Sequence, residues 1–74
     1  SGSPFSKCFG AAVRRHRIKN GFSQEKLAEL ALLHPTYISM VERSARNPTL
    51  DVAHRLSKAL GLKLSDLIRE VEGR

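Results

Sequence analysis

Three hydroxyl-bearing side chains lie close together near the middle of the sequence. Thr36, Tyr37 and Ser39 fall within four positions, and none of them carries a formal charge. Such groups can read the edges of DNA bases by hydrogen bonds, and a threonine methyl group can contact thymine. Basic residues lie on either side of the segment, as is typical of contacts that hold DNA phosphates. The segment is therefore a candidate for sequence-specific DNA recognition.

Other side chains that carry chemistry are present but do not form a recognisable site. They are three histidines, two carboxylates four residues apart and one thiol: His16, His34, His54, Glu25, Glu29 and Cys8. The histidines are scattered, and no partner cysteines accompany them at metal-ligand spacing. The carboxylates have no nucleophile, base or phosphate-binding loop beside them, which favours a solvated helix face. We therefore expect no enzyme activity and no bound metal, cofactor or small-molecule ligand.

The charge of the chain favours a polyanionic partner. The 74 residues include 13 Lys and Arg against 7 Asp and Glu, a net charge of +6. This balance is typical of small domains that bind nucleic acid, here double-stranded DNA; the alternative is that the charge serves solubility alone. No apolar run approaches the roughly 18 residues of a membrane-spanning helix, so no membrane partner is expected. A single free cysteine fits the cytoplasm, where DNA binding would place the protein with the nucleoid.

The hydrophobic pattern predicts five short helices and no strand, because apolar residues recur at helical spacing throughout. The first helix runs from Phe5 to a stop at Asn20–Gly21. The expected starts of the others are the caps Ser23, His34, Thr49 and Ser65, with Pro35 as the first residue of the third helix. We predict one compact all-α domain over residues 5–74, and we interpret residues 1–4 as a cloning remnant.

Each predicted helix has an apolar face that we expect to be buried. In chain order, the inward positions are Phe5, Cys8, Phe9, Ala12, Val13 and His16; Leu27, Ala28, Leu30 and Ala31; Ile38 and Val41; Leu50, Ala53, Leu56 and Leu60; and Leu64, Leu67, Ile68 and Val71. Only residues 32–34 separate the second and third helices, which is the spacing of a helix-turn-helix unit. The second helix of such a unit lies in the major groove of DNA.

The same region contains several short runs with a recognisable pattern: 21–28 (GFSQEKLA), 37–39 (YIS), 42–43 (ER), 46–50 (RNPTL) and 59–61 (ALG). Together they resemble the lambda-repressor-like, or Xre-type, helix-turn-helix family, and the resemblance extends from Phe9 to Val71. It implies a five-helix DNA-binding fold. Within that family, residues 36–39, 42–43 and 46–47 are similar to the controller proteins of restriction–modification systems.

The resemblance implies roles for the matching positions. It makes Gln24 a phosphate contact that also braces the reading helix, and it makes Arg17 and Glu42 an ion pair between the first and third helices. The remaining expected DNA contacts are His34, Pro35, Thr36, Tyr37, Ser39, Met40, Arg43, Arg46 and Asn47. The alternative for Tyr37 is a place at the edge of the core, and Met40 is as well explained by packing against the second helix or the loop. Arg43, Arg46 and Asn47 match positions that hold the DNA backbone or reach bases.

The sequence departs from the family pattern at four positions. Leu32 replaces the usual glycine of the turn, and a left-handed conformation there would carry about 1–3 kcal/mol of strain; the alternative is a turn of another shape. Pro35 replaces an Arg or Gln and removes one potential bidentate base contact. Ser44 replaces the glycine after the third helix, and His16 takes a position usually filled by Leu.

These features predict a transcriptional regulator that binds DNA as a homodimer. Two copies would read a two-fold operator whose half-site centres lie about 10 base pairs apart. The family resemblance implies dimerisation through the C-terminal region. Part of the apolar face of the fifth helix must close the core, and we expect the remainder to form the dimer interface, among Leu64, Leu67, Ile68 and Val71. The alternative function is an antitoxin-like module that binds a toxin protein and regulates its own operon.

Overall fold

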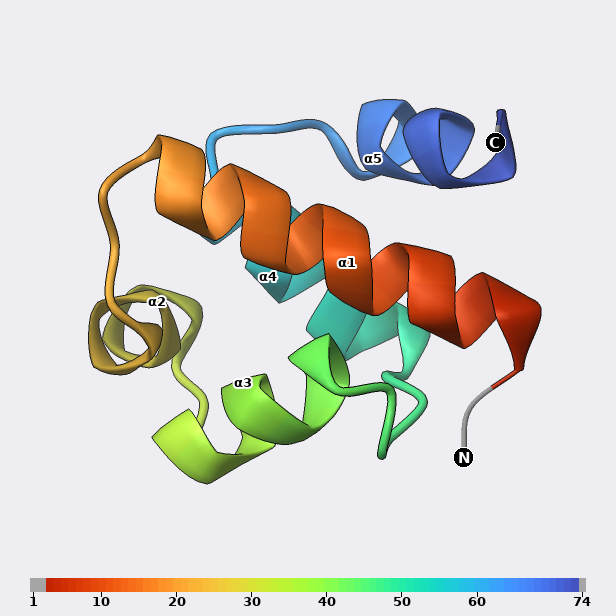
Figure 1. Ribbon diagram of the computed structural model, residues 1–74. Helices are drawn as coiled ribbons and strands as arrows, with labels where there is room; N and C mark the ends of the chain where they lie inside the picture. The colour runs from red at the N-terminus through yellow and green to blue at the C-terminus, as the bar shows by residue number, and fades with distance from the viewer. Residues whose placement is uncertain (1–2, 74) are drawn as a thin grey trace.

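The computed structural model describes residues 3–73 and contains five α-helices over that range. They are α1 (Pro4–Lys19), α2 (Gln24–Ala31), α3 (Pro35–Glu42), α4 (Leu50–Ala59) and α5 (Leu64–Glu72). The described residues contain no strand. In Figure 1, α1 crosses the middle of the molecule with α5 on one side and α3 on the other. The predicted all-α architecture is therefore confirmed.

Side-chain caps fix where most of the helices begin. Ser23 and Thr49 each accept a hydrogen bond from the backbone N–H three residues later, at 2.9 and 3.2 Å. His34 Nδ1 accepts one from the backbone N–H of Thr36 at 3.1 Å. These bonds satisfy donors that the first turn of a helix leaves free. The predicted starts of α2, α3 and α4 are therefore confirmed.

The predicted cap of α5 is wrong. This helix begins at Leu64, and its N-cap residue Lys63 makes no side-chain capping bond. Leu64 packs against the core, so burial of this side chain, rather than a hydroxyl bond from Ser65, sets the start of the helix.

The beginning of α1 overlaps the segment interpreted as a cloning remnant. Ser3 caps α1 by accepting a hydrogen bond from the backbone N–H of Ser6 at 3.1 Å, and Pro4 is the first residue of the helix. Residues 1 and 2 lie outside the described residues, and the interpretation of residues 1–4 stays a prediction.

All five helices, with Leu60 at the end of α4, contribute to one apolar core. Its buried members are Phe9, Ala12, Val13, Leu27, Ala28, Ala31, Ile38, Val41, Ala53, Leu56, Leu60, Leu67 and Val71. Three residues expected inside are instead exposed: Phe5 by 47%, Leu30 by 43% and Leu50 by 78%. Phe5 and Leu50 lie in the first turns of α1 and α4, where a helix can extend past its neighbours. No helix within residues 3–73 has the length and apolar character needed to cross a membrane.

Candidate nucleic-acid interface

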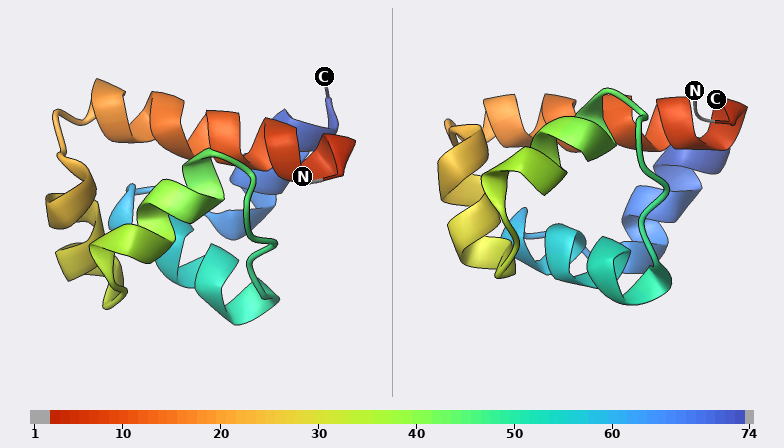
Figure 2. Two further views of the ribbon diagram at one scale, coloured as in Figure 1. Left: turned by 60° about the horizontal axis from the view of Figure 1, so that its bottom comes forward. Right: turned by 90° about the horizontal axis from the view of Figure 1, so that it is seen from below.

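Helices α2 and α3 are joined by the short turn at residues 32–34 and form a helix-turn-helix unit. The turn places Leu32 in the left-handed conformation, with φ 60° and ψ 46°. The turn therefore has the left-handed, strained conformation at Leu32 rather than a different shape. Seen from below, α3 lies in front of the other helices, with α2 beside its beginning (Figure 2, right).

The two sides of α3 differ in character. Ile38 and Val41 are buried, so one side anchors the helix in the core, as predicted. Thr36 is exposed at the beginning of the helix, next to the exposed cap His34. The remaining members of the predicted reading face are half-buried: Pro35, Tyr37, Ser39 and Met40. The outer side of α3 therefore carries short polar groups, while Ile38 and Val41 fix its inner side in the core.

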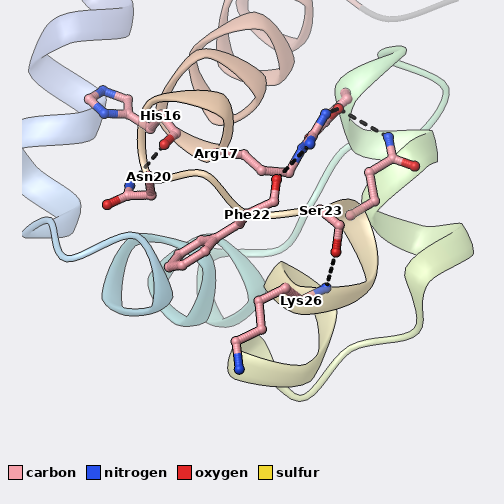
Figure 3. A network of polar contacts seen from close by, with 8 residues as sticks. His16, Arg17, Asn20, Phe22, Ser23 and Lys26 are labelled. Atoms are coloured by element: carbon pink, nitrogen blue, oxygen red, sulfur yellow. Dashed lines mark hydrogen bonds and ion pairs between the residues drawn. The ribbon is translucent and has the colours of Figure 1, made fainter.

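A buried ion pair ties the end of α3 to α1. Arg17 Nε donates a hydrogen bond to Glu42 Oε2 at 2.6 Å, and Nη2 donates to Oε1 at 3.1 Å. The third nitrogen, Nη1, donates to the backbone oxygen of Phe22 at 2.9 Å, as Figure 3 shows. The hydrogen bond to Glu42 raises the pKa of the Arg17 guanidinium above its ordinary value. The ion pair implied by the family resemblance is therefore present.

Gln24 joins the same cluster from α2. Its Nε2 donates to Glu42 Oε1 at 3.1 Å, so one carboxylate receives hydrogen bonds from both α1 and α2. Gln24 is also the first residue of α2, where free backbone N–H groups and the helix dipole favour an anion. The bracing role expected for Gln24 is thus visible in its geometry.

The end of α3 and the following loop carry the basic residues of the site. Arg43 and Arg46 are exposed. Arg43 Nε donates to Ser39 Oγ at 3.3 Å, which lays the guanidinium along the reading face. Asn47 is also exposed, and its Oδ1 accepts a hydrogen bond from the hydroxyl of Ser6 on α1. Arg43, Arg46 and Asn47 therefore follow one another at the end of α3 and in the loop after it, and Asn47 is anchored to α1.

Sequence reasoning missed the residues of α1 that hold the end of α3. Ser44 adopts φ 61°, and its hydroxyl donates to the backbone oxygen of Ser6 at 3.2 Å. A Cβ at Gly10 would lie 2.3 Å from the backbone oxygen of Val41, so only glycine permits this approach. A glycine in the middle of an amphipathic helix was the available signal, because such a residue usually has a packing reason.

The residues expected at a dimer interface do not all reach the surface. Leu67 and Val71 are buried in the core of the subunit, which leaves a second subunit little of their surface to contact. Both lie on the side of α5 that closes the fold. Leu64 and Ile68 remain half-buried, and they are the members of the set that a second subunit can reach.

The histidines and carboxylates do not converge on a metal site. His16 Nε2 lies 2.8 Å from Glu70 Oε1, and Arg15 donates to the other oxygen of that carboxylate. These two hydrogen bonds, the one with His16 first, lower the pKa of Glu70 to about 2. No group of three or more potential metal ligands occurs within residues 3–73. His16 therefore serves to join α1 to α5.

Comparison with known proteins gives a consistent assignment. The model of the helix-turn-helix family matches residues 13–67. The control protein C.BamHI of Bacillus amyloliquefaciens is 51% identical over 61 residues, which are 81% of this chain and 75% of that protein. The restriction–modification controller protein C.AhdI from Aeromonas hydrophila superposes with a TM-score of 0.81 at 37% identity, covering 84% of this chain and 94% of that one.

A further solved structure includes DNA. The controller protein C.Esp1396I, determined as a tetramer in complex with its natural 35 base-pair operator, superposes with a TM-score of 0.83 at 30% identity. The match covers 95% of this chain and 97% of that one. The chain belongs to the helix-turn-helix family, among relatives that include the control proteins of restriction–modification systems.

Proposed function

We propose that this protein is a sequence-specific transcriptional regulator that binds a two-fold DNA operator as a homodimer, with α3 in the major groove. The observation that carries the proposal is the construction of α3. Its apolar side is locked into the core by Ile38 and Val41, while short polar side chains face outward from its first turns. A helix held in this way can enter the major groove, which is about 12 Å wide, without rearrangement.

The proposed contacts divide into two classes. His34, Pro35, Thr36, Tyr37, Ser39 and Met40 lie along the reading face and would meet base edges or methyl groups. Gln24 lies at the beginning of α2, and Arg43, Arg46 and Asn47 lie at the end of α3 and in the following loop. These four residues would mainly hold phosphates, and the last three would hold the backbone or reach a base. This division follows the general rule that backbone contacts position a protein and base contacts specify the sequence.

We infer more narrowly that the protein controls a restriction–modification operon. The 51% identity to C.BamHI and the structural match to C.AhdI support this assignment. A regulator of this kind acts in the cytoplasm, on DNA of the nucleoid. Binding at a promoter would repress transcription by occupying the site.

A hollow on one face of the molecule suits a second subunit. It has a volume of about 390 Å³ and is lined by residues of α1, the α3–α4 loop, α4 and α5. The exposed side chains of Phe5 and Leu50 and the half-buried Ile68 surround it, and all three are apolar. The subunit measures 27 × 25 × 21 Å. A dimer that reads two successive major grooves on one side of the DNA must place its α3 helices about 34 Å apart, which is one turn of DNA.

Selection of bound duplexes from a random DNA pool at near-physiological salt tests the proposal. We expect recovery of a two-fold symmetric motif. Thr36→Ala should then change the recovered motif at one position in each half-site, whereas Arg46→Ala should weaken binding to all sequences more evenly. Recovery of no motif, with binding only at low salt, would mean that the charge gives non-specific adhesion. That result would favour the antitoxin-like alternative, which a co-purifying protein partner would support.

A further inference from the structure

An arginine on α4 holds the turn between α2 and α3. Arg55 Nη2 donates a hydrogen bond to the backbone oxygen of Leu32 at 2.7 Å, and Nε donates to that of Ala31 at 3.3 Å. A third contact, from Nη1 to Asp51 Oδ2 at 3.4 Å, lies within α4 and orients the guanidinium. One side chain therefore binds two successive carbonyl groups at the point where α2 ends.

The turn held in this way has an unfavourable backbone conformation. Leu32 is left-handed, and such a conformation costs a residue with a Cβ free energy that glycine does not lose. Packing does not explain the conformation, because the Leu32 side chain is 78% exposed. Within the turn, the backbone N–H groups of Leu32 and Leu33 bond to Glu29 and Ala28 of α2, at 3.3 and 2.8 Å. The hydrogen bonds from Arg55 on α4 add to these backbone bonds within the turn.

Arg55 also supplies a charge that α2 lacks. The last turn of α2 contains no basic residue, although a cation there stabilises the negative end of the helix dipole. Arg55 provides this cation from a neighbouring helix. The hydrogen bond from Arg55 also orients the Leu32 carbonyl. Only Leu33 and His34 separate Leu32 from the first residue of α3.

We propose that Arg55 is a positioning residue for DNA recognition. By holding the strained turn closed, it sets the direction in which α3 begins, and therefore the direction in which Thr36 meets the DNA. Arg55 acts through the turn and needs no contact with a base. This inference rests on the proposed function, since it concerns how the reading helix is presented.

The test compares Arg55→Met with Lys58→Met. Both variants remove one positive charge from α4, and Lys58 is exposed and has no part in the turn. Affinity for the selected operator is measured by fluorescence anisotropy at a temperature where circular dichroism shows both variants folded. We expect Arg55→Met to lose about tenfold more operator affinity than Lys58→Met. Affinity for a random duplex should fall equally in the two variants, because that affinity depends on charge alone.

A second variant separates positioning from general stability. Glycine adopts the left-handed conformation without the Cβ cost, so Leu32→Gly should keep the turn closed without help. Adding Leu32→Gly to Arg55→Met should restore most of the operator affinity, while Leu32→Gly alone should bind like the parent. An equal loss from Arg55→Met in both backgrounds would overturn the proposal, as would a loss no larger than that of Lys58→Met. If Arg55→Met does not fold, Arg55→Lys takes its place; it keeps the charge but not the pair of carbonyl contacts.

A measurement without DNA separates this inference from the proposed function. Hydrogen exchange of the Leu33 amide reports closure of the turn, because that N–H bonds to Ala28. We expect faster exchange in Arg55→Met and recovery when Leu32→Gly is added. Unchanged exchange would overturn the inference even if operator binding fell. Absence of any selected operator for the parent protein would instead reject the proposed function, and with it the role of Arg55 in recognition.

Discussion

Glu42 is the last residue of α3, and its side chain is only 3% exposed, so its negative charge must be compensated inside the protein. Arg17 from α1 and Gln24 from α2 both donate hydrogen bonds to it. A single carboxylate therefore relates three helices to one another. A site that reads DNA needs this relation fixed, because a small rotation of α3 would move every side chain on its outer face.

Breaking this ion pair should be costly. Arg17→Met leaves the Glu42 carboxylate buried without its charged partner, and we expect a loss of about 3–5 kcal/mol in the free energy of unfolding. Urea denaturation followed by circular dichroism measures it. The double variant Arg17→Met with Glu42→Leu is the control, because it removes the stranded charge and should recover much of the loss. A loss below about 1 kcal/mol from Arg17→Met would show that the pair behaves like an exposed one.

The His16–Glu70 contact should make stability depend on pH. The pKa of Glu70 is about 2 in the folded protein against an ordinary value of 4.5, mainly because of the hydrogen bond with His16 and then that from Arg15. A lowered folded-state pKa means that the carboxylate stabilises the fold fully above about pH 4.5, and that this contribution disappears as the pH falls towards 2.

Comparison of the parent with Glu70→Gln checks this contribution. The parent should unfold at a higher urea concentration at neutral pH, and the difference should shrink as the pH is lowered from about 4.5. Glu72→Gln, an exposed position in the same helix, serves as the control and should show a much smaller difference. A difference between the parent and Glu70→Gln that stays constant down to about pH 3 would contradict the assignment.

At the scale of the helices, the approach of α1 to the end of α3 depends on Gly10. The backbone oxygens of Val41 and Glu42 occupy the space that a Cβ at position 10 would need. Ser6, one turn earlier on α1, accepts a hydrogen bond from Ser44 and donates one to Asn47. The first half of α1 thus supports both the end of α3 and the loop that carries Arg46.

Gly10→Ala should therefore destabilise the protein even though alanine is the better helix former. Alanine gains about 1 kcal/mol over glycine in a helix interior. The overlap with the Val41 oxygen must push α3 away and should cost about 1–3 kcal/mol more than that gain. Ala11→Gly, at the exposed neighbouring position, measures the helix-propensity part alone. Thermal unfolding checks both, and a more stable Gly10→Ala variant would show that α3 can shift freely.

The sequence was sufficient to predict the five helices, because apolar spacing and caps such as Ser23 and Thr49 are local signals. It was not sufficient to show which apolar residues become buried. Leu50 keeps the spacing of its helix, yet the first turn of α4 extends past its neighbours and leaves Leu50 exposed. The cap of α5 was missed for a related reason, since packing of Leu64 overrides the preference of Ser65 for a capping position.

The candidate site was predictable to a similar degree. The position of Thr36 follows from the helical pattern of the sequence, and the pairing of Arg17 with Glu42 was implied by the family resemblance. The supporting contacts of Arg55 and Ser6 match no motif in the sequence, and each joins segments more than twenty residues apart. Contacts of this kind arise from the way helices pack, and helical periodicity carries no information about them.

For the whole molecule, the ion pairs separate the arginines that are paired within the protein from those that are not. Within residues 3–73, carboxylates pair with four arginines, namely Arg15, Arg17, Arg55 and Arg69. Arg43 and Arg46 form no ion pair over the same range, and both are exposed beyond the end of α3. Arg43 and Arg46 therefore place uncompensated positive charge where phosphates would lie.

This distribution predicts the salt dependence of operator binding. Two subunits that each neutralise two phosphates, through Arg43 and Arg46, should give a slope of about −4 for the logarithm of affinity against the logarithm of salt concentration. Arg46→Ala removes one contact from each subunit, and the slope should become shallower by about 2. Arg69→Ala removes the same charge from α5, where Arg69 pairs with Asp66, and should leave the slope nearly unchanged. Anisotropy titrations over a range of salt concentrations measure the three slopes.

A slope near zero for the parent would contradict DNA binding through phosphates. Equal slopes for the parent and Arg46→Ala would show that the face beyond α3 does not contact the DNA backbone.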